Sequence, residues 1–153
     1  MGANPYWYFV PHEADIDTAL QRLRLREFQA GRYNPVTPFP RFPVDTSAYA
    51  TAPQQGSIDD VLDASNEDGT RSILDILQVS LTPFDGSEMP QFTAFPLADS
   101  QIVDLFGTAR PTRKAAETSK SIWDHIQRGS AIYTTIFADD RPDEIFFAGY
   151  SFD

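Results

Sequence analysis

The chain has 153 residues, a formal net charge of −10 and no cysteine. This length suits one domain with a buried core, and 13% aromatic with 22% charged residues is typical of a globular protein rather than a disordered one. The excess of carboxylates disfavours nucleic acid or an anionic membrane as a partner, and the missing cysteines exclude disulfides and thiolate metal sites.

A strand and a helix are predicted at the start of the chain. Residues 6–10 are aromatic residues and a valine between two prolines, which is typical of a short, largely buried strand. Asp15 or Asp17 can cap the helix that follows, and Gly31 suits the left-handed residue at its end. Apolar residues with helical spacing should form its core face: Ile16, Ala19, Leu20, Leu23 and Ala30.

A long loop is predicted from about residue 33 to residue 56. Prolines interrupt any helix or central strand in this segment. Loops of this length inside a compact domain are uncommon and are usually either functional or disordered. Three aromatic residues are interleaved among the prolines: Phe39, Phe42 and Tyr49.

Short elements are predicted next. Ser57 and Asp60 form a capping pattern at the start of a short helix. Residues 72–81 show helical spacing and then alternation, which predicts a turn of helix leading into a strand. A further strand is expected over residues 91–97.

Two more helices are predicted before the C-terminal strands. The first opens at Asp99 or Ser100, either of which can cap it, and ends at Gly107. The second is longer and runs from about residue 112 to Arg128. Its apolar residues share one face: Ala115, Ala116, Ile122, Trp123 and Ile126.

Residues 131–138 and 144–152 are rich in β-branched and aromatic residues, and the polar residues 139–143 between them predict a turn. The order of elements lacks the regular alternation of a doubly wound sheet. The sequence therefore predicts a single α+β domain over residues 1–153, with an antiparallel or mixed sheet, helices mainly on one face and a C-terminal β-hairpin.

Three polar residues near the start of the chain are candidates for chemistry. His12 and Glu13 stand where the predicted strand meets the helix, beside further carboxylates that could bind an ion or form an acid/base pair. Capping and the helix dipole favour carboxylates there in any case, which is the simpler explanation. Glu27 falls in the apolar stripe of the helix, which suits either a buried general acid or an ion pair with a neighbouring arginine.

Residues 66–75 match part of an EF-hand calcium loop in the spacing of their oxygen-bearing side chains. The match fails at the first ligand position, which is Ala64, and at the last, where Asp75 is shorter than the usual glutamate. The sequence also lacks the motifs of phosphate loops, dinucleotide sites and zinc proteases. We therefore expect no metal and no cofactor.

The start of the chain has neither a signal peptide nor an apolar run long enough to span a membrane, which predicts a cytoplasmic protein. Missing catalytic motifs, the acidic charge and the long loop predict a non-catalytic interaction protein, of the partner or inhibitor type. It should bind another protein, and a basic protein or a cationic patch fits its charge better than nucleic acid or membrane. The predicted binding residues are Phe39, Arg41, Phe42 and Tyr49, unless these aromatic residues fold back over the domain's own core.

A small-molecule enzyme or binding protein is the alternative, with a carboxylate-based site near His12, Glu13 and Glu27. A deep pocket that contains Glu27 would favour this alternative. A structural subunit of an assembly is a third hypothesis, and a stable homo-oligomer would distinguish it. The sequence identifies neither the partner nor a substrate.

Overall fold

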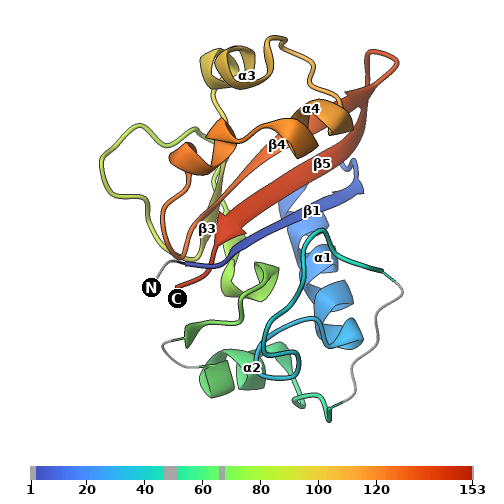
Figure 1. Cartoon of the computed structure of the whole chain (residues 1–153), viewed down its shortest axis with the longest axis vertical. Coiled ribbons are helices and arrows are strands. Elements are labelled where there is room, and N and C mark those ends of the chain that lie inside the picture. The colour runs from blue at the N-terminus through green and yellow to red at the C-terminus, as the bar shows by residue number, and fades with distance from the viewer. Residues whose placement is uncertain (1–2, 47–51, 66–67, 153) are drawn as a thin grey trace.

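The structure of the chain, a computed structural model, describes residues 3–46, 52–65 and 68–152 (Figure 1). A sheet with the strand order β1-β5-β4-β3-β2 lies at its centre. The strands are β1 (Pro5–Pro11), β2 (Gln78–Val79), β3 (Thr93–Pro96), β4 (Ala131–Ala138) and β5 (Arg141–Tyr150). The helices are α1 (Ile16–Ala30), α2 (Ile58–Ser65), α3 (Asp99–Phe106) and α4 (Arg113–Thr118), and two 3-10 segments are η2 (Ile73–Asp75) and η3 (Ser121–His125).

The sheet is mixed. β5 is antiparallel to both of its neighbours, whereas β2, β3 and β4 run parallel to one another. Asp139 and Asp140 both have positive φ, 51° and 59°, and form a two-residue turn whose twist suits a hairpin. The predicted α+β domain, mixed sheet and C-terminal hairpin are confirmed. The turn is shorter than predicted, because β5 already begins at Arg141.

Both faces of the sheet are covered by helices (Figure 1). A cluster that includes Tyr6, Tyr8 and Leu20 fills the side of α1, and a second cluster with Ile122 and Phe146 fills the side of α3, α4 and η3. The helices, predicted mainly on one face, therefore lie on both. The reason is the parallel pairing of β3 and β4, because parallel neighbours need a crossover that passes over one face of the sheet.

The ends of α1 lie where the sequence predicts them. The side chain of Asp15 accepts hydrogen bonds from the N–H groups of Asp17 and Thr18, and Gly31 follows the helix at a φ of 69°. Both features satisfy backbone groups that a helix end leaves unpaired. Of the predicted stripe, Ala19, Leu20 and Leu23 are buried.

The prediction of one long helix over residues 112–128 is wrong. α4 ends at Thr118, whose hydroxyl donates to the carbonyl of Lys114, and Ser119 turns to extended backbone with a ψ of 119°. Hydroxyl side chains that bond to nearby backbone weaken a helix interior. The chain resumes as η3, which still buries Ile122 against the sheet. The apolar pattern was therefore that of a buried face and not of one continuous helix.

The start of α3 also differs from the prediction. Its N-cap is Ala98 and not Asp99 or Ser100, so no side chain of the cap residue bonds to the helix. The hydrogen bond at this helix start runs the other way, from the backbone of the cap residue to a side chain of the helix. The side-chain oxygen of Gln101 accepts it from the Ala98 N–H at 2.8 Å. This is one half of a capping box.

Tyr6 packs across the backbone of Gly149, where the edge strand β1 pairs with β5. The two residues are direct partners on β1 and β5, and the Tyr6 side chain is fully buried. A Cβ atom added at Gly149 would lie 2.5 Å from Cζ of the Tyr6 ring. Position 149 therefore has to be glycine as long as Tyr6 keeps its place.

We predict that Gly149→Ala lowers the free energy of unfolding by about 1–3 kcal/mol, because overpacking a buried site forces the ring or the strand to shift. Gly56→Ala is the matched control, since its new Cβ would approach only the movable carboxylate of Asp60, and it should change stability by less than about 0.5 kcal/mol. Denaturant unfolding measures both variants. Equal stability of the two variants would contradict the packing described here.

Candidate functional site

The first half of the long loop is tied to the body of the domain by hydrogen bonds. The Thr37 hydroxyl donates to the carbonyl of Gly31 at 2.7 Å, which turns the chain back at the end of α1. Asn34 donates from its backbone N–H to the carbonyl of Thr70 at 2.8 Å and from its side chain to the carbonyl of Gly69 at 3.0 Å. The described part of the loop is thus built onto the protein.

Phe42 lies at the outer edge of β1. Its ring centroid is 5.4 Å from that of Tyr8 and 6.3 Å from that of Tyr6, which point to the α1 side, and 5.5 Å from that of Trp7. Trp7 packs on the opposite side of the sheet. Since neighbouring side chains of a strand point to opposite faces, a ring that contacts both sets must lie beside the strand. Phe42 therefore folds back onto the core, as the alternative hypothesis for this loop expects.

The edge that Phe42 covers is also poor in hydrogen-bond donors. The His12 N–H donates to the carbonyl of Asp143, so the backbone N–H and C=O groups of every second residue before His12 bond to β5. The backbone groups of the residues between them point away from β5, toward the outer edge of the sheet. Pro5 and Pro11 are two of these outward-facing residues, and proline has no N–H. Another strand would find few donors along β1, so strand addition at this edge is disfavoured.

Phe39 does not share in this packing on the core. Its side chain is 73% exposed. The Arg71 guanidinium lies 4.9 Å from the centre of its ring and also donates to the carbonyl of Pro38 at 2.6 Å. The backbone bond ties Arg71 to the loop, and the cation–π contact favours this position of the ring while it faces solvent. Phe39 is a held aromatic side chain that covers little of its own domain.

Two cavities adjoin Phe39, and both are lined by Phe39, Pro40 and Phe42. The larger, of about 330 Å³, is also lined by Arg32 and Arg41. The smaller is about 260 Å³. We call Phe39, Pro40 and Arg41 with these two cavities the Phe39 surface. Of the other residues predicted for binding, Phe42 forms its floor and Tyr49 lies outside the described residues.

Glu27 is a buried carboxylate held by two arginines. Its side chain is fully buried and forms ion pairs with Arg26 and Arg32, whose side chains are 39% and 11% exposed. Arg32 in turn lines the larger cavity of the Phe39 surface. Glu27 thus has the structural role of an ion-pair partner and helps to position a cation at that cavity.

His12 and Glu13 lie apart from Glu27. Both line a cavity of about 350 Å³, together with Arg22 and Arg26, and Glu13 forms an ion pair with Arg22. Glu27 does not line this cavity. The structure brings two of the three residues of the alternative site together and leaves the third in a separate cluster, linked only through Arg26.

Asp75, at the end of the partial calcium motif, turns into the protein. Its Oδ1 accepts a hydrogen bond from the Thr70 N–H at 2.8 Å, across a turn in which Gly69 has a φ of 72°. Burial raises the pKa of Asp75 to about 6. Within residues 3–46, 52–65 and 68–152, no three His, Asp or Glu side chains gather as metal ligands would.

We predict that Glu27→Gln lowers the free energy of unfolding by about 1–3 kcal/mol, because it removes the buried carboxylate to which two partly buried guanidinium groups are hydrogen-bonded. Glu13→Gln removes the ion pair with Arg22, which is 73% exposed, and should cost less than about 1 kcal/mol. Denaturant unfolding compares the two variants. A larger loss for Glu13→Gln would show that Glu27 does not hold the arginines.

We predict that Asp75→Asn changes how stability depends on pH. Because its pKa is raised, Asp75 stays protonated up to a higher pH in the folded protein than in the unfolded chain. The stability that this protonated carboxyl group gives to wild type is therefore lost as pH rises through about 6. The variant should therefore gain about 1 kcal/mol relative to wild type between about pH 5 and pH 7.5. Asp63→Asn, at an exposed position, is the control for the loss of one carboxylate. A constant difference from wild type across this range would contradict the burial of a titrating Asp75.

A scan against protein-family models and searches of curated proteins and of solved structures find no match to this chain. Among the described residues, no helix combines the length and apolar character that crossing a membrane requires. Functional proposals for this protein therefore depend on the geometry of its own residues, and above all on Phe39, which is exposed and at the same time held in place.

Proposed function

We propose that this chain is a non-catalytic, cytoplasmic protein-interaction protein that binds another protein through the Phe39 surface. The observation that carries the proposal is the 73% exposure of an aromatic side chain that contacts the guanidinium group of Arg71. Aromatic residues dominate the energetics of protein interfaces, and a side chain that is fixed before binding loses little entropy on docking. The cavities on either side of Phe39 offer space for side chains of the partner.

The charges of the chain indicate what kind of partner fits. The net charge of −10 produces a long-range attraction to proteins whose surface is basic. At the Phe39 surface itself the exposed Arg41 presents a planar set of donors, which suits a carboxylate at the rim of the partner's site. A basic partner with an apolar pocket for Phe39 and a carboxylate beside it matches both features, as an inhibited target or as a member of a complex.

The cavity at His12 and Glu13 supports a second candidate function, the binding or conversion of a small molecule. Its volume of about 350 Å³ is near the lower limit for ligand pockets. The ion pair between Glu13 and Arg22 already occupies one of the carboxylates that such a site would use. We therefore place the interaction function first.

We predict that Phe39→Ser weakens partner binding by about tenfold or more and leaves the melting temperature unchanged, because the ring contacts solvent more than its own domain. The measurement is affinity capture from the native cell, followed by a Kd with the purified partner. Leu81→Ser is the matched control, since Leu81 is 80% exposed but lies just after β2, and it should bind as wild type does. Phe42→Ser should instead lower the melting temperature, because Phe42 packs on three aromatic rings of β1.

Capture of the same partners by wild type and Phe39→Ser, with equal Kd, would refute the proposal. A fall in melting temperature for Phe39→Ser as large as that for Phe42→Ser would also refute it, because the ring would then be part of the core. The two substitutions separate the hypotheses of an interface and of a folded-back loop within a single segment.

A further inference from the structure

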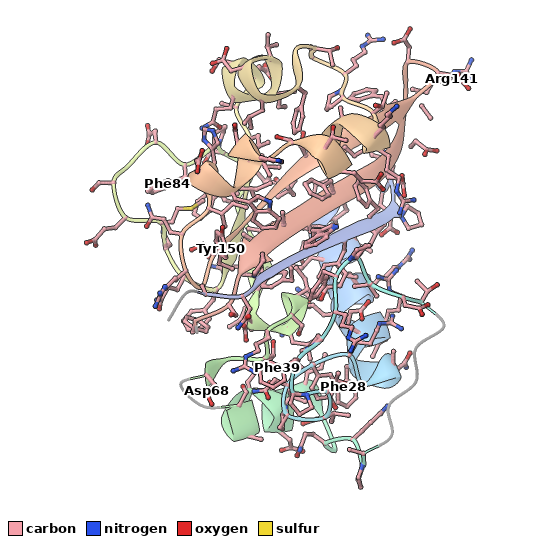
Figure 2. The ribbon with its side chains drawn as sticks, in the orientation of Figure 1. Phe28, Phe39, Asp68, Phe84, Arg141 and Tyr150 are labelled. Atoms are coloured by element: carbon pink, nitrogen blue, oxygen red, sulfur yellow. The ribbon has the colours of Figure 1, made fainter. Side chains whose placement is uncertain are left out.

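A cavity of about 340 Å³ lies at the carboxyl end of β3, away from the Phe39 surface, with which it shares no lining residue. Its walls are the loop that leads from β2 to β3, the start of α3 and the end of η3. Figure 1 shows that loop bowing outward beside the helical segments that cover this face of the sheet, and Figure 2 labels Phe84 within it. The carboxyl ends of parallel strands are a common place for ligand sites.

Apolar side chains, two of them aromatic, form part of the floor of the cavity, whereas most of the surface exposed in it is polar. The rings of Phe84 and Phe95 lie 5.5 Å apart at an angle of 58°, and both side chains line the cavity. A volume of this size holds a small ligand and no more. The floor therefore fits a single ring or a compact apolar group. Its other apolar lining residues are Met89, Leu97 and Ile132.

Two glutamine side chains fix the polar part of the walls. Gln127 accepts a hydrogen bond from the Met89 N–H at 3.0 Å and donates to the carbonyl of Ser87 at 2.9 Å, so it clamps the outward loop to the domain. Gln101 has its oxygen committed to the Ala98 N–H, and its amide nitrogen therefore faces Nδ1 of His125 at 3.4 Å. In the neutral imidazole, Nδ1 then accepts and the proton lies on Nε2. The wall is preorganised and carries a defined donor.

The charges around the cavity favour a cationic ligand. Asp85 and Asp124 line it and are exposed, and no Lys or Arg is found among the described residues that line it. The start of α3 also borders the cavity, and a helix N-terminus carries roughly half a positive charge, which favours an anion. Two full carboxylate charges outweigh that half charge. Asp99 in the first turn of α3 reduces it further.

We propose that this cavity binds a small organic cation that joins an aromatic ring to an amine. The ring would lie on Phe84 and Phe95, and the ammonium group would face Asp85 and Asp124. Gln101 and His125 form the polar wall of the cavity. The site is one of binding and needs no reaction. It shares no residue with the Phe39 surface, so it stands or falls independently of the proposed function.

The test uses three probes that share a phenyl ring and differ in the charge of the polar group attached to it: benzylamine, benzyl alcohol and benzoate. Each is titrated into the full chain labelled with ¹⁵N, and the backbone amide signals of Gln101 and Gly86 and the ring signals of His125 are followed. We expect saturable shifts at these residues with benzylamine in the millimolar range, weaker shifts with the alcohol and none with benzoate. The double variant D85N/D124N should weaken benzylamine binding by about threefold to tenfold, because each exposed charge pair contributes modestly.

The matched control is D59N/D63N, which removes two exposed carboxylates from α2 and should bind benzylamine as wild type does. Equal affinity for benzoate and benzylamine would overturn the proposal, since it would show that the two carboxylates do not select a cation. Tighter binding of benzoate would overturn it too, because the helix N-terminus would then outweigh the carboxylates. Absence of saturable shifts with benzylamine, or an equal loss of affinity in both double variants, would overturn it as well.

Discussion

The contact between Phe42 and the edge of β1 decides how the long loop is arranged. The ring packs against aromatic side chains of both faces of the strand, so it can lie only beside β1. The loop passes along this edge, where Pro5 and Pro11 have no N–H group to donate. This constrained path of the loop leaves Phe39 pointing to solvent. Arg71 then contacts the exposed ring, and the cavities on either side follow from the same path of the chain. One partly buried aromatic residue, Phe42, thus creates the surface on which the exposed Phe39 is presented.

Local signals in the sequence were sufficient where an element is determined by its own ends. Asp15 and Gly31 delimit α1 as predicted, and Ser57 begins α2 by accepting a hydrogen bond from the Asp60 N–H. The prediction failed at residues 112–128, because apolar spacing reports which residues are buried and not whether the helix between them is continuous. The chain breaks at Thr118 and Ser119, between α4 and η3, as it crosses over the sheet, and the spacing of the apolar residues gives no sign of this break.

Candidate sites were harder to predict, because each depends on contacts between distant parts of the chain. Composition correctly indicated a loop rich in proline and aromatic residues, but whether Phe39 or Phe42 faces outward is decided by β1, more than thirty positions away in the sequence. Glu27 stood out as a carboxylate in an apolar stripe, and the arginines that neutralise it were among its neighbours in the sequence. The pairing of Gln101 with His125 left no signal, since two common residues on separate helical segments form no recognisable spacing.

The two proposed surfaces have separate linings but are not confined to separate halves of the core. The Phe39 surface is joined through Phe42 to the cluster on the α1 side and through Trp7, which lines its smaller cavity, to the edge of the other cluster. The cavity beside His125 is joined to that second cluster through Phe95 and Ile132. Between the two lie hydrogen-bonded strands, with β4 paired along its whole length to β5. Coupling between sites requires an element with two arrangements that both ligands influence, and a close-packed, fully paired sheet resists small displacements. Binding of an amine at one surface and of a protein at the other should therefore contribute independently to the free energy of the complex.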